Sequence, residues 1–295
     1  MPFQSGFVSI IGKPNAGKST LLNALLGEKI SIVTSKIQTT RHRIKGILST
    51  PNYQLVFSDT PGIIEAKYEL HKSMMEKVKE SLEDADVLLI LIDASQKDHG
   101  TEELALYVGE VHLPQIIALN KADLTTAEQL EAVKSACSIQ FRDAEIIAIS
   151  ALKSEHLDEL LAAILKKIPE QEPFYPGEEI TDISERFIIS ELIREKIFEL
   201  FQKEIPYSSQ VLIQDWKEIK EMLHIRAEII VERESQKGII LGKGGEAIKK
   251  LGILSRKDIE AFLQRKIFLG LTVKVNANWR NDPSKLKYYG YGGRG

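Results

Sequence analysis

The stretch Gly12-Lys13-Pro14-Asn15-Ala16-Gly17-Lys18-Ser19 decides the architecture of the first half of this chain. An apolar run over residues 7–11 precedes it, and a helical pattern over residues 20–26 follows it. This order of strand, glycine loop and helix lets GxxxxGK[ST] form a phosphate cradle, because backbone N–H groups and the helix N-terminus converge on an anion. Lys18 is placed to supply charge to the outer phosphates, and the Ser19 hydroxyl to ligate Mg²⁺. The alternative, a chance turn rich in Gly and Lys, does not account for both flanks.

Charge is distributed unevenly along the chain. The 295 residues contain 39 Lys and Arg against 42 Asp and Glu, a formal net charge of −3. Residues 226–295 hold 15 of the basic and 7 of the acidic residues, so this segment carries +8 and the remainder −11. The length predicts roughly two domains. An acidic front and a basic tail predict an anionic partner for the tail, with nucleic acid the first candidate.

The composition also bears on the compartment. Cys137 is the single cysteine, which excludes an internal disulfide framework and fits a reducing compartment. The longest strongly apolar run, residues 87–92, is too short to span a bilayer. Residues 1–6 lack the charged and apolar regions of a signal peptide. We therefore expect a soluble, intracellular protein.

Apolar runs alternate with helical patterns in the first half. The runs cover residues 8–11, 55–57, 87–92, 116–119 and 146–149. Their continuous apolarity predicts parallel strands that are buried on both faces and joined by crossover helices. Residues 43–49 predict an additional strand at an edge. The sequence therefore predicts an α/β fold with a doubly wound, mostly parallel sheet that binds ligands at the carboxyl ends of its strands.

The second half shows a different pattern. A helical pattern over residues 157–168 ends the first domain, and three prolines and a glycine interrupt regular structure over residues 169–180. The elements expected after this linker are a helix over 187–203, strands over 210–216 and 225–233, a short apolar stretch over 238–241, helices over 246–251 and 258–268, and a strand over 271–275. The last residues, 288–295, are basic and aromatic and predict a flexible tail.

Three further motifs follow apolar runs. Asp59-Thr60-Pro61-Gly62 offers a carboxylate for the Mg²⁺ shell and a glycine N–H for a γ-phosphate, although alone it would be an ordinary turn. In Asn120-Lys121-Ala122-Asp123, the Asp123 carboxylate can accept hydrogen bonds from guanine N1–H and N2–H₂, a pattern that adenine cannot present. Asn120 would tie the loop together, and the Lys121 stem would lie over the base. Ser150-Ala151 could bring a backbone N–H to guanine O6, a signal that is useful only in series.

Together these motifs resemble the GTP-binding proteins over residues 7–170. The predicted GTP-binding residues are Gly12, Lys13, Pro14, Asn15, Ala16, Gly17, Lys18, Ser19, Thr20, Asp59, Thr60, Pro61, Gly62, Asn120, Lys121, Asp123, Ser150 and Ala151. The predicted Mg²⁺ ligands are Ser19, Thr40 and Asp59, and the predicted catalytic residues are Lys18, Thr40, Asp59 and Gly62.

The resemblance also assigns roles between and after these motifs. Related GTPases use the second Thr of a pair such as that in Gln38-Thr39-Thr40-Arg41-His42 to complete the Mg²⁺ shell when GTP is bound, so Thr40 is favoured over Thr39. Ras-like proteins carry a water-orienting Gln where this chain has Ile63, so we expect slow intrinsic hydrolysis. In several relatives the residue equivalent to Asn15 helps to bind K⁺, which makes K⁺ a candidate cofactor here.

A second glycine loop, Gly242-Lys243-Gly244-Gly245, lies in the basic tail between the apolar residues 239–241 and the helical pattern over 246–251. Its terminal glycines allow close approach to a sugar-phosphate chain, and a GxxG loop joining two helices beside a sheet is how KH domains clamp about four nucleotides of a single strand. The helix–strand–strand–helix–helix–strand order resembles the type II KH arrangement. The predicted RNA-binding residues are Gly242, Lys243, Gly244, Gly245, Lys249, Lys250, Arg256 and Lys257. The alternative is a glycine-rich turn on a solvated basic face.

A P-loop NTPase domain followed by a smaller α+β type II KH domain resembles the Era family of bacterial ribosome-assembly GTPases, a relative of TrmE and EngA, over nearly the whole chain. The expected limits are residues 1–168 for GTP binding, 169–180 for a linker, 181–287 for the KH domain and 288–295 for the tail. The resemblance implies a GTP-hydrolysing switch that binds 16S rRNA near its 3′ end and the 30S subunit. It also implies a cytoplasmic location with some peripheral association with the inner membrane. We expect a monomer, although the sequence is silent on oligomeric state.

Other functions remain open at this point. In a passive RNA-binding protein the nucleotide would be structural, and measurable turnover would separate that case from a switch. An RNA-modifying GTPase would need a second catalytic constellation, and the sequence offers no candidate. A signalling GTPase acting only on proteins would need neither a GxxG clamp nor a strongly basic tail.

Overall fold

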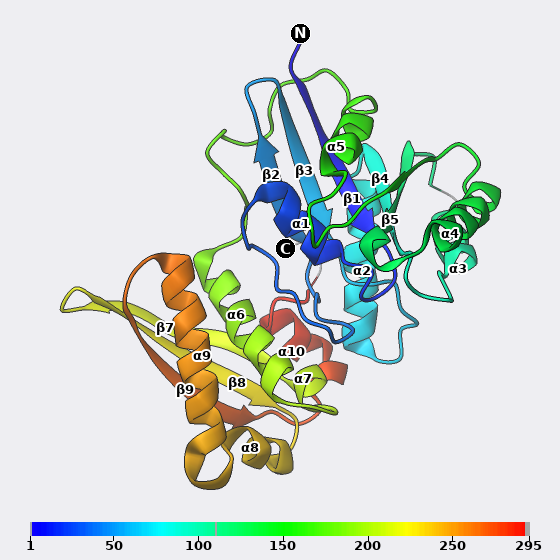
Figure 1. The fold of residues 1–295 in the computed structure, drawn as a ribbon. Helices are drawn as coiled ribbons and strands as arrows, with labels where there is room; N and C mark the ends of the chain where they lie inside the picture. The colour runs from blue at the N-terminus through cyan, green and yellow to red at the C-terminus, as the bar shows by residue number, and fades with distance from the viewer. Residues whose placement is uncertain (1, 110, 293–295) are drawn as a thin grey trace. The chain divides into compact units, whose positions relative to one another are not determined.

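The computed structural model describes residues 2–109 and 111–292 (Figure 1). The chain divides into two compact units. The first comprises residues 1–31, 40–66 and 74–182, and the second comprises residues 32–39, 67–73 and 183–295.

The first unit is built on a six-stranded sheet with the order β2-β3-β1-β4-β5-β6. Its strands are β1 (Gln4–Ile11), β2 (Ile44–Ser49), β3 (Tyr53–Asp59), β4 (Val87–Asp93), β5 (Gln115–Asn120) and β6 (Glu145–Ala148). All neighbouring pairs are parallel except β2 and β3, which are antiparallel. The predicted doubly wound α/β fold is therefore confirmed, and the predicted additional strand is the edge strand β2.

Helices cover both faces of this sheet. They are α1 (Lys18–Leu26), α2 (Glu69–Glu83), α3 (Thr101–Val108), α4 (Ala127–Gln140) and α5 (Leu157–Leu165), with a short 3₁₀ turn, η1 (Ala122–Leu124). Val78 of α2, Leu104 of α3 and Val133 of α4 pack in one core with every second residue of β4. The intervening Leu89 and Leu91 are also completely buried, and Figure 1 shows α1 and α5 in front of the sheet. This two-sided burial explains the continuous apolar runs.

The second unit is a three-stranded sheet with helices packed on one face. Its elements are α6 (Glu185–Leu200), α7 (Ile205–Ser208), β7 (Gln210–Ile219), β8 (Met222–Val231), α8 (Glu234–Leu241), η2 (Lys243–Gly245), α9 (Glu246–Leu263), β9 (Ile267–Val275), η3 (Trp279–Asn281) and α10 (Pro283–Tyr288). β7 pairs with β8 antiparallel and β8 with β9 parallel, so β9 is an edge strand. Ile193 of α6 and Ile259 of α9 share a core with Ile225 and Ile229 of β8. This is the order of the predicted KH domain.

Helix α9 corrects the prediction of two separate helices over 246–251 and 258–268. Leu251, Ser255 and Ile259 are all buried at a spacing of four residues, so a single helix keeps one face on the core. It ends because Gln264 has a φ of 52°. Residues from Ile267 onward form the strand β9, which begins earlier than the predicted strand over 271–275.

Residues 169–180 form no named helix or strand, but they are fastened within the first unit. The Ser5 N–H donates to Pro169 O at 3.3 Å, and the Gln54 side-chain oxygen accepts from the Phe174 and Tyr175 N–H groups at 2.8 and 3.0 Å. The Ile47 N–H donates to Ile180 O at 2.8 Å. The predicted linker therefore lacks regular structure, as expected, and is hydrogen-bonded to strands of the first unit.

The prediction of a flexible tail over 288–295 is wrong for its first part. Tyr289 and Tyr291 are 6% and 2% exposed. The Tyr291 hydroxyl lies 2.6 Å from Gln210 Oε1, and both tyrosine rings pack against the buried Trp279. The reason is that α10 returns the chain onto the second unit, which local sequence does not reveal. The remainder of the predicted tail, residues 293–295, lies outside the described residues.

Candidate functional site

The first glycine loop connects the carboxyl end of β1 to α1, and protein atoms crowd its glycines. A Cβ at Gly12 would lie 2.3 Å from Leu91 O, and one at Gly17 would lie 2.2 Å from Asn120 Nδ2. Gly17 also has a φ of 100°, which side-chain-bearing residues rarely adopt. Only glycine therefore fits at these two positions, and the loop is held in one shape.

A cluster of oxygen atoms lies beside this loop. The Ser19 hydroxyl is 2.6 Å from Asp59 Oδ2 and 2.9 Å from the Thr40 hydroxyl, and the Ser31 hydroxyl donates to the same Asp59 oxygen at 2.8 Å. Asp59 is completely buried, and its other oxygen, Oδ1, has no hydrogen-bond partner among the residues that the structure describes. A buried carboxylate oxygen needs a partner, and two hydroxyls with one carboxylate are the hard oxygen donors that Mg²⁺ takes. The three predicted ligands thus come together and fit the ion.

Burial shifts the pKa values of both charged groups in this region, Asp59 and Lys18. It raises the pKa of Asp59, against the hydrogen bond from Ser19 and the charge of Lys18. It lowers the pKa of Lys18 to about 8, although the nearby Asp59 opposes the shift. The Lys18 ammonium donates to Gly12 O and Lys13 O at 3.1 and 3.0 Å. Each group would be better stabilised in its charged form by an opposite charge, which a cation at Asp59 and a phosphate at Lys18 would supply.

The structure also distinguishes the two threonines of the predicted switch. The Thr40 hydroxyl belongs to the oxygen cluster, whereas the Thr39 hydroxyl lies 2.7 Å from that of Thr34 and donates to Lys36 O at 2.8 Å. This geometry favours Thr40. Ser31 is a member of the cluster that sequence reasoning missed, because no motif marks a lone serine before the switch.

The segment after β3 packs closely on the first loop. A Cβ at Gly62 would lie 2.7 Å from Pro14 N, and the Ile63 N–H donates to Gly12 O at 3.1 Å. The Thr60 hydroxyl donates to Ile10 O at 2.8 Å. The Ile63 side chain is buried in the core with α2 and α3, so it offers no group that could orient water.

The predicted base-recognition loops meet through Asn120. Its side chain donates to Ala16 O at 2.8 Å and accepts from the Ala151 N–H at 2.9 Å, so it joins the phosphate loop to the loop after β6. The hydrogen bond from the Ser150 hydroxyl lowers the pKa of the Asp123 carboxyl, and Lys153 lowers it further. Asp123 is therefore held as an acceptor. The Lys121 ammonium donates to Asp93 Oδ2 at 2.6 Å, which extends its stem across the end of β4.

The other predicted members of the first loop have different surroundings. The Lys13 ammonium lies 3.0 Å from Glu103 and 3.5 Å from Asp98, outside the oxygen cluster. Asn15 is exposed, with a φ of 63°. Thr20 lies in the first turn of α1.

The second glycine loop, Gly242 to Gly245, is open where the first is crowded. Only Gly242 has a close neighbour, since its Cβ would lie 2.6 Å from that of Ala247. Gly244 and Gly245 have φ values of 60° and 83° and nothing within 4 Å of an added Cβ. Lys243, between Gly242 and Gly244, is exposed. This loop therefore has room for a ligand to approach its backbone.

A groove of about 300 Å³ runs beside this loop, between α9 and β9. Ile248, Ile253, Leu269 and Leu271 give it apolar walls. Lys249 and Arg256 also line it. The other two predicted RNA-binding cations, Lys250 and Lys257, are exposed on α9 but do not line the groove. An apolar groove with two cations suits bases and phosphates together.

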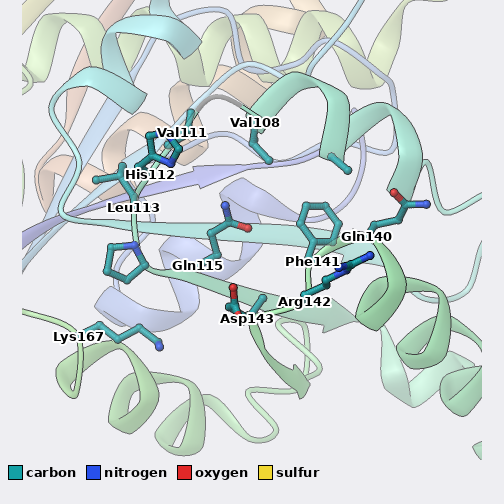
Figure 2. Close-up of a pocket in the computed structure, with 14 residues that line it drawn as sticks. Val108, Val111, His112, Leu113, Gln115, Gln140, Phe141, Arg142, Asp143 and Lys167 are labelled. Carbon is teal, nitrogen blue, oxygen red and sulfur yellow. The ribbon is translucent and has the colours of Figure 1, made fainter.

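Another hollow of about 390 Å³ in the first unit is not the nucleotide site (Figure 2). Val108, His112, Gln115, Phe141 and Arg142 are among its lining residues. Gln115 begins β5, so this hollow lies at the amino ends of the strands, opposite the loops described above. It contains none of the predicted site residues.

Comparison with known proteins identifies both units. A family described as 50S ribosome-binding GTPase matches residues 7–121, and a KH domain family matches residues 204–280. GTPase Era of Geotalea daltonii is 43% identical, with 98% of each chain covered. The chain belongs to the Era family of GTPases. GTPase Era of Syntrophus aciditrophicus is 45% identical, with 98% of this chain and 95% of the relative covered.

Two solved Era structures extend this assignment. An Era in complex with MgGDPNP and nucleotides 1506–1542 of 16S ribosomal RNA is 41% identical, with a TM-score of 0.94 over 98% of this chain and 99% of that one. A variant of Aquifex aeolicus Era bound to GDP and AlF₄⁻ is 42% identical, with a TM-score of 0.93 over the same shares. The predicted pairing of a P-loop GTPase with a KH domain is confirmed, and the chain is a GTPase. No helix in the described ranges is long and apolar enough to cross a membrane.

Proposed function

We propose that this GTPase is a molecular switch that binds GTP with Mg²⁺ in the first unit and RNA in the second. The nucleotide would lie against the loop Gly12–Ser19, with Lys18 on its outer phosphates and Asp123 on guanine. Mg²⁺, when bound, would neutralise charge that develops on the phosphates, and Ser19, Thr40 and Asp59 would hold it. The observation that carries this assignment is the unpaired, buried Asp59 Oδ1 beside two hydroxyls. The Era bound to MgGDPNP supports it.

The residues around the proposed phosphate site bear on the rate of GTP hydrolysis. Gly62 would offer its backbone N–H to the γ-phosphate. Gly12 and Gly17 keep the loop pre-shaped, so that little reorganisation is needed. Ile63 provides no hydrogen bond to an attacking water. We therefore propose slow intrinsic hydrolysis, with K⁺ held in part by Asn15 as a candidate activator.

The second unit would bind RNA at its open glycine loop. A sugar-phosphate chain can approach closely at Gly242, Gly244 and Gly245. Its phosphates would contact Lys243, Lys249 and Arg256. Additional positive charge nearby would come from Lys250 and Lys257. We propose that the RNA is 16S rRNA near its 3′ end and that binding assists assembly of the 30S subunit. The Era bound to nucleotides 1506–1542 of that RNA supports this choice.

A physical route for the switch begins within the second unit. The segment Ile32–Thr39 belongs to that unit, where the Val33 N–H donates to Glu195 of α6 at 3.0 Å and the buried Arg194 donates to Thr39 O. Thr40, the next residue, belongs to the oxygen cluster of the first unit. Binding of Thr40 to Mg²⁺ would therefore pull on the adjoining segment Ile32–Thr39, which is hydrogen-bonded to α6.

Several finer assignments belong to the same proposal. The GTP-binding domain would extend over residues 1–168 and the KH domain over 181–287. Family membership supports a cytoplasmic location, peripheral association with the inner membrane and a monomeric state.

The test is crosslinking of the full chain to RNA in cell lysate, followed by sequencing, with GTP bound and then with GDP bound. We expect reads concentrated near the 3′ end of 16S rRNA, in amounts that differ between the two nucleotides. The Lys18→Ala variant, which should bind neither nucleotide, serves as the control. Equal crosslinking of unrelated RNA in both states would contradict the proposal.

A further inference from the structure

The second unit contains a hollow that none of these roles uses. It has a volume of about 490 Å³ and lies between the sheet and α10. Its lining residues are Leu212, Gln214, Glu228, Ile230, Lys274, Asn276, Ser284, Lys285, Tyr288 and Tyr289. Glu228 and Ile230 alternate along β8 with Ala227 and Ile229, which pack in the helix-covered core. The hollow therefore lies on the face of the sheet opposite to α6 and α9.

The lining has the chemistry that a nucleotide requires. Leu212 and Ile230 give an apolar floor, and Gln214 and Glu228 offer hydrogen-bonding groups for the edge of a base. Lys274 and Lys285 also line the hollow. Their ammonium groups lie 3.8 Å from Glu228 Oε2 and 3.6 Å from Asp282 Oδ2, and they could also contact phosphate.

Tyr288 is the feature that points to a base. Its side chain is 73% exposed, whereas the neighbouring Tyr289 and Tyr291 are 6% and 2% exposed. An exposed aromatic ring beside a hollow that two lysines help to line is an arrangement on which bases of single strands stack. The wall behind it is already ordered, because Asn276 donates to the Tyr289 hydroxyl at 2.5 Å and Gln214 donates to Glu228 at 3.2 Å.

The hollow and the groove between α9 and β9 share the edge strand β9. Leu269 and Leu271 line the groove on one face, and Lys274 and Asn276 line the hollow on the other. Leu271 and Lys274 are three residue steps apart along the strand, a distance of about 10 Å. A KH loop clamps only about four nucleotides, so a longer strand leaving the groove could pass around β9.

We propose that this hollow is a second subsite for single-stranded RNA, in which one base stacks on Tyr288 after the strand has rounded β9. The subsite rests on the proposed RNA-binding function. The Glu228 carboxylate, which already accepts from Gln214, can also accept a hydrogen bond from a donor group on the edge of the base.

The test uses the full chain and an RNA with the sequence of 16S nucleotides 1506–1542. Tyr288→Ala should weaken binding about tenfold, which corresponds to roughly 1.4 kcal/mol and lies within the range for loss of one stacked base. Tyr288→Phe retains the ring and should bind within about twofold of the parent. Phe268→Ala is the matched control, because Phe268 is a 47% exposed aromatic on the same sheet that does not line the hollow. It should also stay within about twofold.

The outcomes separate this subsite from the proposed function itself. Wild-type affinity in Tyr288→Ala, or equal losses in Tyr288→Ala and Tyr288→Phe, would overturn stacking on Tyr288. The clamp variant Lys243→Asp/Gly244→Asp is measured beside them. If that variant loses affinity while Tyr288→Ala does not, the RNA-binding function stands and the second subsite falls. If both bind as the parent does, the proposed RNA-binding function fails as well.

Discussion

The chain contains two glycine loops that each precede a helix, and their glycines serve different purposes. In the loop Gly12–Ser19, added Cβ atoms would collide with Leu91 O and with the Asn120 amide. In the loop Gly242–Gly245, Gly244 and Gly245 face open space. The first loop therefore requires glycine because the protein packs against it, and the second because of its positive φ values and the room left for a ligand. A glycine motif alone does not distinguish these cases.

The largest expected effect comes from removing the Lys18 ammonium group from the loop Gly12–Ser19. Lys18→Ala should weaken GTP binding by at least about a hundredfold, because charged hydrogen bonds to phosphate contribute roughly 1.5–3 kcal/mol each. The measurement is direct titration with GTP, with thermal melting to show that the variant is folded. Lys134→Ala on the exposed side of α4 removes the same charge elsewhere and should bind GTP as the parent does. Similar affinities for both variants would remove Lys18 from the site.

A pair of alanine substitutions tests whether the two glycine loops differ in how closely protein atoms pack against them. Gly17→Ala should destabilise the protein by about 2–3 kcal/mol, because the new Cβ meets the Asn120 amide at 2.2 Å. Gly244→Ala meets nothing and should cost only about 1 kcal/mol for its left-handed backbone. Denaturant unfolding of both variants gives the two values. Equal costs would show that crowding does not separate the loops.

The sequence predicts those features of the fold and site that depend on neighbouring residues, and it misses those that depend on contacts between distant residues. Continuous apolar runs predict the buried strands, and the edge strand β2 is also predicted. The motifs that follow strands predict the residues brought together around Asp59 and Asn120. Ser31 is missed, because its role depends on a contact with Asp59, 28 positions away. The flexible tail is wrong for the same reason, since Tyr291 meets Gln210 across 81 positions.

Base selection gives a smaller expected effect. Asp123→Asn should weaken GTP binding about tenfold or more and raise the relative affinity for xanthine nucleotides, because the exchanged hydrogen-bond pattern suits a carbonyl at C2. Titration with GTP and XTP measures both quantities. Asp143→Asn, on an exposed carboxylate near the other end of the sheet, is the matched control. Unchanged GTP affinity in Asp123→Asn would show that guanine is recognised elsewhere.

The smallest expected effect concerns the exposed side of the first loop. If Asn15 helps to hold K⁺, replacing K⁺ by Na⁺ at constant ionic strength should lower the rate of GTP hydrolysis about fivefold, because the smaller ion fits the same ligands less well. Asn15→Ala should remove the difference between the two salts. Equal rates for the parent chain in both salts would reject K⁺ as a cofactor.

The central claim is that RNA contacts the open loop Gly242–Gly245 whereas GTP contacts the crowded loop Gly12–Ser19, and one measurement tests it most directly. Affinity for the RNA with the sequence of 16S nucleotides 1506–1542 is determined for Lys243→Asp/Gly244→Asp and for the uncharged match Lys243→Gln/Gly244→Asn. Asp and Asn both tolerate the left-handed backbone at Gly244. The account predicts that the acidic variant loses RNA binding, that the uncharged variant loses only part of it, and that both keep the parent's GTP affinity and melting temperature. Parental RNA affinity in the folded acidic variant would contradict it.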